Sequence, residues 1–356
     1  MTQHRPSGFI APLHAFRAVA IVNIVAVHAG SLAVYDFGGG TAADPALRAV
    51  AALNETLFHD ATLYFALVSG LLFTAVLKGR GWARFYETKA KYVLLPYVAT
   101  SLLFTYAHWH WSQDLQLFGG GPLAFAETAA RNVLFGTAMG QFWYVPVLAC
   151  LFVLTPFLSA LLSHRLGRRA IAVIVLAPLL VSRTGAEATV PTVVYFLGAY
   201  AAGMALGRDH AGVLAWLKRR RIALLSVAAV TSAALFWMIW TGTGAEGPVR
   251  LQQSLFYVQK AALAGLFLAL LAGIGERVPR VLDALADHAF AIYFLHVFAL
   301  YTLGHVARQA HAPPQGALAV TLLALGFLAA SLAFSVAVSA AARAVLGKRA
   351  RMVLGS

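Results

Sequence analysis

The sequence predicts an all-α integral membrane protein, a single bundle of about ten transmembrane helices, and three observations predict it. The chain has 356 residues, of which 60% are apolar and only 11% are Asp, Glu, Lys or Arg. A soluble domain carries roughly 25% of these charged residues. The apolar residues gather in windows of about 17 to 25 residues, the length that crosses a bilayer. The basic residues lie mainly in short loops between these windows. This composition excludes a water-soluble enzyme.

Ten windows fit membrane spans, and the first covers residues 13–34. A basic stretch followed by apolar residues also resembles a secretory signal peptide. Arg17 and His28 bracket the apolar core, however, and further windows follow, so we expect the first helix of a bundle. Each remaining window is apolar over a membrane-spanning length and is separated from the next by a polar or Gly/Pro-containing segment. These windows are 57–77, 92–108, 142–163, 170–186, 190–207, 222–241, 254–274, 289–308 and 316–342.

An even number of spans places both chain termini on one side of the membrane. If that side is the cytoplasm, 21 of the 27 Lys and Arg residues fall on the inner side, as the positive-inside rule requires. We therefore expect a multi-pass protein of the bacterial inner (plasma) membrane with cytoplasmic N- and C-termini. Segments 35–56 and 109–140 are then outer candidates for a substrate-binding surface. The six outer basic residues are Arg48, Arg131, Arg183, Arg250, Lys260 and Arg308.

The net charge and the cysteine count limit which partners and metal sites are expected. A net charge of +14 raises nucleic acid as a partner in a globular domain, but here the charge serves topology, so we expect none. The single cysteine, Cys150, excludes an internal disulfide and a cysteine metal site, and no metal site is predicted. Residues 1–356 are expected to form one transmembrane domain without a fused extracytoplasmic domain.

The first helix carries His14, Arg17 and His28. Arg17 and His28 are 11 residues apart, which returns their side chains to within roughly 20° on the same helix face. Their axial separation is about 16.5 Å, which places Arg17 at the membrane boundary and His28 beyond the bilayer centre. A cation at the boundary and a titratable base at depth suit an anionic ligand with a long arm.

Five short segments follow one another along the chain: LHAFRAVAIVNIVAVH, YFALVSGLLF, FYETKAKYVLLPY, FWYVPVL and AFAIYFLH. In this order they resemble the membrane-bound acyltransferase family 3, which transfers acyl groups to hydroxyls of surface polysaccharides, lipid-linked sugars and some antibiotics. The first helix resembles the family's Arg, ten residues, His pattern. Three later helices resemble its Ser-Gly, Pro-Tyr and Trp-Phe-x-Pro patterns, and the ninth its Ile-Tyr-x-x-His.

The chain departs from the family pattern at two places. Many relatives have Arg-x-x-Arg before the third helix, whereas Lys89 and Tyr92 stand here, so the phosphate-binding role falls to Lys89 and Lys91. A serine before the ninth helix is replaced by Ala289. Some relatives also carry an extracytoplasmic hydrolase-like domain, so we expect this chain to act alone or with a separate extracytoplasmic transferase.

The resemblance implies an O-acyltransferase that moves an acyl group, most often acetyl, from acyl-CoA to a carbohydrate hydroxyl. Acyl-CoA is a co-substrate, and no permanently bound cofactor is expected. His28 would be the catalytic residue, as general base or as acyl carrier. The donor would be bound by Arg17, Lys89, Lys91 and His14. Further substrate-site candidates are His296, Tyr293, Trp143, Tyr144, Ser69 and Asp60.

Each candidate also has a structural interpretation. His28 would hydrogen-bond to a carbonyl of a neighbouring helix. The Arg17 side chain would extend to the membrane surface, and Lys89 and Lys91 would only set the membrane topology. Trp143 and Tyr144 would belong to an outer aromatic belt, and Ser69 with Gly70 to a close helix contact. For Asp60 the functional interpretation is that it enters the second span from the outer side and orients the His28 imidazole.

Two other functions fit the composition. A transporter or flippase of a lipid-linked sugar or small anion would have two halves with matching broken helices, a pairing that the sequence does not show. A polyprenyl-phosphate glycosyltransferase would carry an acidic motif at an aqueous face, and the cluster Asp36, Asp44, Glu55 and Asp60 matches none that we recognise.

Overall fold

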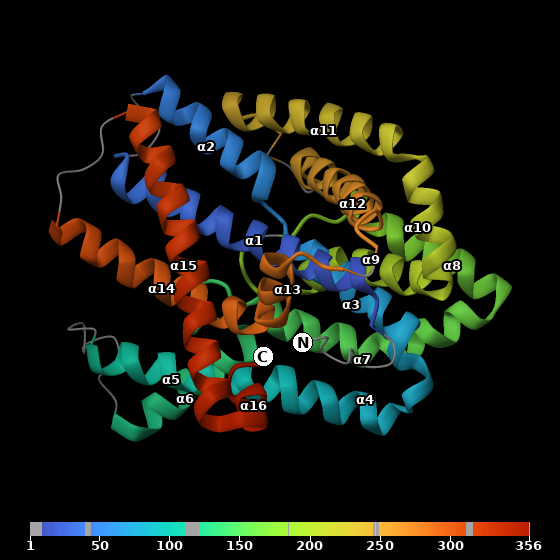
Figure 1. Ribbon diagram of the computed structural model, residues 1–356, viewed down its shortest axis with the longest axis horizontal. Coiled ribbons are helices and arrows are strands. Elements are labelled where there is room, and N and C mark those ends of the chain that lie inside the picture. Colours follow the sequence, from blue (N-terminus) through green and yellow to red (C-terminus); the bar gives the residue numbers. More distant parts are fainter. Residues whose placement is uncertain are drawn as a thin grey trace.

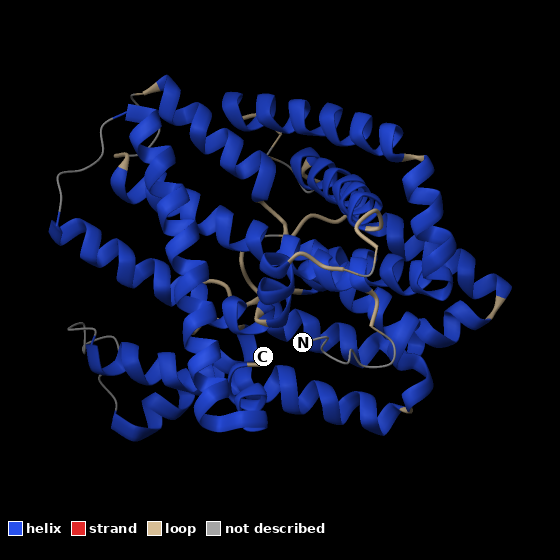
Figure 2. Ribbon diagram, in the orientation of Figure 1, coloured by secondary structure: helices blue, strands red, loops and turns tan. Residues whose placement is uncertain are grey.

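The computed structural model describes residues 9–39, 44–111, 121–183, 185–244, 246, 249–275, 277–310 and 316–355. These residues form helices joined by loops, without a strand among them (Figure 2). Several helices are long and apolar enough to cross a membrane. The chain is therefore a multi-pass, all-α membrane protein, as its sequence predicts.

Eight helical stretches of the described residues have the length and composition of a membrane span. Four of them are continuous helices, and four combine a helix with an adjoining shorter one. The continuous helices are α7 (Tyr144–Ser163), α11 (Arg221–Thr241), α12 (Leu251–Leu271) and α14 (Ala289–Ala310). The composite stretches are Ala11–Phe37, Pro45–Leu77, Val190–Arg219 and Gly316–Leu354.

The composite stretches contain the remaining long helices of Figure 1. The first holds α1 (Ala11–Ser31) and the second holds α2 (Pro45–Phe58) and α3 (Thr62–Leu72). The third holds α9 (Val190–Leu206) and α10 (His210–Arg219), and the last holds α15 (Gly316–Leu346) and α16 (Ala350–Leu354). Shorter helices between the spans are α4 (Trp82–Lys89), α6 (Gly121–Phe135) and α13 (Arg280–Asp287).

Two of the ten expected windows form shorter helices. Window 92–108 corresponds to α5 (Leu95–Trp111), which has 17 residues. Window 170–186 corresponds to α8 (Arg165–Leu176), whose 12 residues reach only about 18 Å. A turn containing Pro178 follows α8, and the chain then continues without a helix to Arg183. The helix of this window is therefore shorter than expected, and it packs against α7 and α9.

The second span begins earlier than expected and is broken. It runs from Pro45 to Leu77, so much of segment 35–56 is helix within a candidate span rather than a loop. Polar residues lowered the hydropathy of this half, but Asn54 donates to the Val27 carbonyl of α1 at 3.1 Å. The helix is interrupted between Phe58 and Thr62, where Asp60 has φ 57°, the one positive φ among described non-glycine residues.

In segment 109–140, the other expected outer surface, residues 121–135 form α6, which packs on α5. Residues 112–120 lie outside the described part of the chain.

In the Ser69-Gly70 pair, Gly70 forms a close helix contact and Ser69 lines a cavity. A Cβ on Gly70 would lie 2.1 Å from the Tyr200 carbonyl of α9, so only glycine allows α3 and α9 to approach so closely. This confirms the close helix contact expected at this motif. Ser69, one residue earlier, is half-buried and lines the pocket described next.

Candidate functional site

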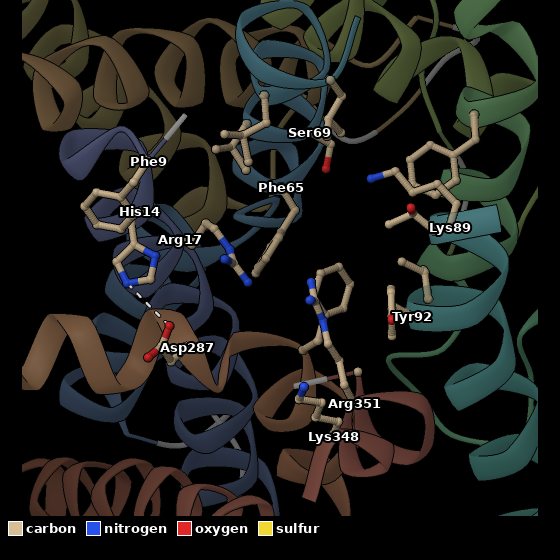
Figure 3. A pocket seen from close by; sticks show the side chains of 18 of the residues that line it. Phe9, His14, Arg17, Phe65, Ser69, Lys89, Tyr92, Asp287, Lys348 and Arg351 are labelled. Atoms are coloured by element: carbon tan, nitrogen blue, oxygen red, sulfur yellow. Dashed lines mark ion pairs between the residues drawn. The ribbon is translucent and has the colours of Figure 1, made fainter. Parts of the chain in front are cut away.

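A pocket of about 970 Å³ lies at the end of the bundle where α1 begins. Its walls come from α1, α3, α4, α13 and the C-terminal part of the chain, and Phe9 and Gly355 both line it. The two ends of the described chain therefore lie beside one cavity (Figures 1 and 3). We call this end of the bundle the pocket end.

The pocket is strongly cationic. Figure 3 shows Arg17, Lys89 and Arg351 reaching into the same space from three elements. Arg343 and Lys348 also line the pocket. The structure thus brings together Arg17 and Lys89, two residues proposed from the sequence to bind the same ligand, although 72 positions of chain separate them.

His14 shares this pocket but is engaged with carboxylates. Its Nε2 lies 3.1 Å from Asp283 and 3.7 Å from Asp287 of α13. These two acidic residues therefore face His14, leaving the opposite side of the pocket to the basic side chains. His14 fixes α13 against α1 at the rim of the pocket.

Lys89 is held between two aromatic rings. Its Nζ lies 4.6 Å from the ring centroid of Phe152 and 5.5 Å from that of Phe85, a cation–π arrangement. Burial, with Arg17 and Arg351 nearby, lowers the pKa of Lys89 to about 8. Cations gathered this closely raise each other's electrostatic energy unless an anion binds among them.

Lys91 lies outside the pocket, so grouping it with Lys89 at one site was wrong. Its side chain is exposed and pairs with Glu87 at 2.5 Å, one helical turn earlier. The two lysines are two residues apart, which points them to different sides of a helix. Surface pairs of this kind contribute little to stability.

The histidine of the first helix meets a second histidine deep in the bundle. The rings of His28 and His296 lie 5.3 Å apart, centroid to centroid. His296 is fully buried, and its Nδ1 lies 2.9 Å from the carbonyls of Ile292 and Tyr293. Nδ1 must therefore carry the proton, which leaves the lone pair on Nε2. That Nε2 has no hydrogen-bond partner among the described residues.

Aromatic residues extend from this pair towards α7. Tyr293 lies 6.2 Å from the His296 ring and 6.5 Å from that of Tyr144. The Tyr293 hydroxyl donates to the Gln141 carbonyl. The Tyr144 hydroxyl and Gln141 Oε1, both buried, have no partner in the described part of the chain. Unpaired buried polar atoms are costly, and both atoms can hydrogen-bond to a polar group that enters this interior.

Trp143 and Tyr144 are core residues, not members of an outer aromatic belt. Their exposed fractions are 8% and 3%. The Trp143 ring faces the Arg183 guanidinium at 5.1 Å and packs on Phe196 of α9. Its ring is therefore occupied by the protein itself.

Asp60 binds Arg183 and Tyr195, and among the described residues it makes no contact with His28, so its expected orienting role is wrong. Arg183 Nε and Nη2 lie 2.9 and 2.5 Å from Asp60 Oδ1, and the Tyr195 hydroxyl donates to Oδ2 at 2.9 Å. The Asp60 side chain is fully buried and that of Arg183 is 9% exposed. A buried charge of this kind requires its partner.

Two polar residues of α12 donate hydrogen bonds to the backbone at the break beside Asp60. Lys260 donates to the Leu57 carbonyl at 2.8 Å, and Gln259 donates to the Thr56 carbonyl at 2.9 Å. These carbonyls are left without partners where α2 ends. Lys260 is therefore a helix-capping residue in the middle of a span, although the sequence placed it in the outer set.

His59 contacts both Arg183 of this cluster and Glu55. Its Nδ1 lies 2.9 Å from Glu55, and its Nε2 lies 3.3 Å from Arg183 Nη2. Because arginine only donates, Nε2 accepts and Nδ1 donates to Glu55. Glu55 and His59 lie within electrostatic range of His28.

The fold and this site define a membrane protein that holds a cationic pocket at one end and a histidine pair within its helices. Residues 10–340 match the family described as an acyltransferase domain, acyltransferase family 3. The match covers most of the 356 residues, so the chain belongs to this family and is a membrane acyltransferase. No curated protein and no solved structure shows significant similarity to the chain.

Sequence reasoning missed two sets of residues. Arg343, Lys348 and Arg351 were counted only as topology signals, and no local pattern links them to Arg17. Arg183 and Lys260 were counted as outer-loop charges. Lys260 carried a usable signal, because a lysine inside an apolar window is costly without a partner.

The Asp60–Arg183 pair predicts a large stability effect. Asp60→Asn keeps the side-chain size but leaves the Arg183 guanidinium buried without a counter-charge, which should lower the free energy of unfolding by about 3 to 5 kcal/mol. Asp36→Asn is the matched control, since Asp36 pairs with Arg308 at 3.1 Å with both side chains exposed, and should cost less than about 1 kcal/mol. Unfolding in detergent micelles, followed by tryptophan fluorescence, measures both. Equal losses would contradict the assignment.

Proposed function

We propose that the protein is a bacterial inner-membrane O-acyltransferase that moves an acetyl group from acetyl-CoA to a carbohydrate hydroxyl. The acceptor class is an exported or cell-surface polysaccharide or its lipid-linked precursor. One observation carries the proposal: α1 presents Arg17 to the cationic pocket and His28 to the buried histidine pair. One ligand with a phosphate-rich end and a long arm ending in a reactive group fits both.

Donor binding follows from the pocket. The phosphates of the CoA moiety bind among Arg17, Lys89 and the other cations, and the pantetheine arm extends along α1. The distance to cover between Arg17 and His28 is about 16.5 Å along the helix axis. Ser69 faces the pocket and offers the arm a hydroxyl at its entrance.

The chemistry takes place at the histidine pair. His28 removes the proton of the acceptor hydroxyl while the hydroxyl oxygen attacks the thioester carbonyl carbon. The carbon–sulfur bond then breaks, and the leaving thiolate takes the proton from His28, which yields an ester and the free CoA thiol. His296 Nε2, with its free lone pair, accepts the second N–H of the His28 imidazolium. If the His28 imidazole attacks first, an acyl-imidazole gives the same products in two steps.

The acceptor approaches from the end opposite the pocket. Glu55 and His59, near His28, remain 26% and 30% exposed, so this side of the histidine pair is the more open to polar groups. The concentration of Lys and Arg in alternate loops supports a cytoplasmic pocket end with both termini there. The donor then enters from the cytoplasm and the carbohydrate from the outer side.

His28→Ala is expected to reduce transfer at least about 100-fold, because the general base is lost. His296→Ala should lower kcat while leaving KM for acetyl-CoA within about twofold, since the pocket is untouched. Release of CoA thiol and transfer of label from radiolabelled acetyl-CoA to membrane polysaccharide measure these effects in purified, correctly folded variants. His305→Ala, an exposed histidine of the same helix as His296, is the control. A His28→Ala variant with more than about a tenth of wild-type turnover would overturn the proposal.

Lys89 predicts the pH dependence of donor binding. With its pKa lowered to about 8, Lys89 is mostly charged at pH 7 and mostly neutral at pH 9. kcat/KM for acetyl-CoA should therefore fall by about tenfold over this range as the cation is lost, while kcat changes less. Lys89→Arg does not titrate in this range, so its kcat/KM should stay flat. A pH profile that is the same for the wild type and for Lys89→Arg would contradict the role of Lys89.

A further inference from the structure

The C-terminal segment folds back over the pocket. After α15 comes the turn Gly347–Arg349, and helix α16 then packs against α5 and the segment before it. Gly355 has a left-handed φ of 74°, and a Cβ there would lie 3.0 Å from Phe290 and 3.3 Å from the Tyr92 carbonyl. The C-terminal segment is therefore tightly packed against Phe290 and Tyr92 at Gly355.

Arg351 is held over the ring of Tyr92. Its Cζ lies 4.4 Å from the ring centroid, a short distance for a cation–π contact. Figure 3 shows its guanidinium in the space that Arg17 and Lys89 also enter. Among the described residues Arg351 has no carboxylate partner, because Asp283 and Asp287 face His14. Its five donors remain available to a ligand.

The position of Tyr92 in the sequence relates this contact to ligand binding. Tyr92 stands three residues after Lys89, where the family pattern has its second arginine. Arg351 brings a guanidinium to the pocket from the opposite end of the sequence, directly on the Tyr92 ring. Residues 341–355 lie beyond the region that matches the family.

We propose that Arg351 is a donor-binding residue that completes a phosphate clamp with Arg17 and Lys89. Its ligand is the diphosphate of the acyl donor, which a planar guanidinium binds through two parallel hydrogen bonds. Tyr92 holds the guanidinium in place. The C-terminal segment is thereby part of the binding site, and the inference rests on the proposed function.

Arg351→Ala should raise KM for acetyl-CoA about tenfold or more, the cost of a lost charge-assisted hydrogen bond. Arg351→Lys should lie between this variant and the wild type, since lysine keeps the charge but loses the planar fork. Arg349→Ala, an exposed arginine two positions earlier that does not line the pocket, should leave KM unchanged. Tyr92→Arg in the Arg351→Ala background should recover most of the loss.

A donor without phosphates separates binding from folding. With acetyl-pantetheine, Arg351→Ala and the wild type should turn over equally, because the diphosphate is missing. If Arg351→Ala reduces the use of both donors to the same extent, Arg351 is structural and the inference fails. It also fails if Arg351→Ala and Arg349→Ala have the same KM for acetyl-CoA.

Direct binding of desulfo-CoA, a nucleotide that carries the diphosphate but no thiol and no acyl group, tests Arg351 independently of turnover. Weaker binding to Arg351→Ala than to Arg349→Ala supports a phosphate site, and equal binding overturns it. A wild-type protein that binds this nucleotide but consumes no acetyl-CoA refutes the proposed function and not the phosphate site.

Discussion

The buried Asp60–Arg183 ion pair determines how the second span is built, and much of the interior depends on it. An ionised carboxylate inside a membrane bundle is tolerated only with a full set of partners. Arg183 and Tyr195 supply them, and the backbone turns at Asp60 to present the carboxylate. The same break frees the last carbonyls of α2, which Lys260 and Gln259 then satisfy. α2, α3, α9 and α12 are thereby joined at one level of the bundle.

In the proposed mechanism, the residues at this level help to position His28 and take no part in the reaction. Arg183 also contacts His59, which pairs with Glu55 near His28. On the other side, α1 lies in the centre of the bundle (Figure 1) and packs on α3, α13 and α14. One straight helix therefore fixes the distance between the pocket and the histidine pair. The family to which the chain belongs requires an acyl group to be delivered and transferred, and this arrangement provides two sites at a set separation.

The features that were predictable from sequence are those set by helix periodicity. The common face of Arg17 and His28 follows from their spacing, and the packing at Gly70 from its small size. The choice between Lys89 and Lys91 did not follow, because it depends on which side of this helical segment meets Phe152 of α7. The Asp60–Arg183 and Tyr92–Arg351 contacts join residues more than 120 and 250 positions apart. A hydropathy window shows that a charge inside a span is costly, but it does not show which residues offset that cost.

The most direct test of the account is the side from which the donor is used. Acetyl-CoA is too highly charged to cross lipid unaided, so vesicles of known orientation separate the two faces. With the pocket end outward, acetyl-CoA added to the bath should be consumed and the acetyl ester should appear on a glycan enclosed in the vesicle lumen. With the pocket end inward, added acetyl-CoA should remain intact. Consumption in both orientations, or transfer only to a glycan on the donor's own side, would contradict an acyl group passing through the bundle from the pocket to His28.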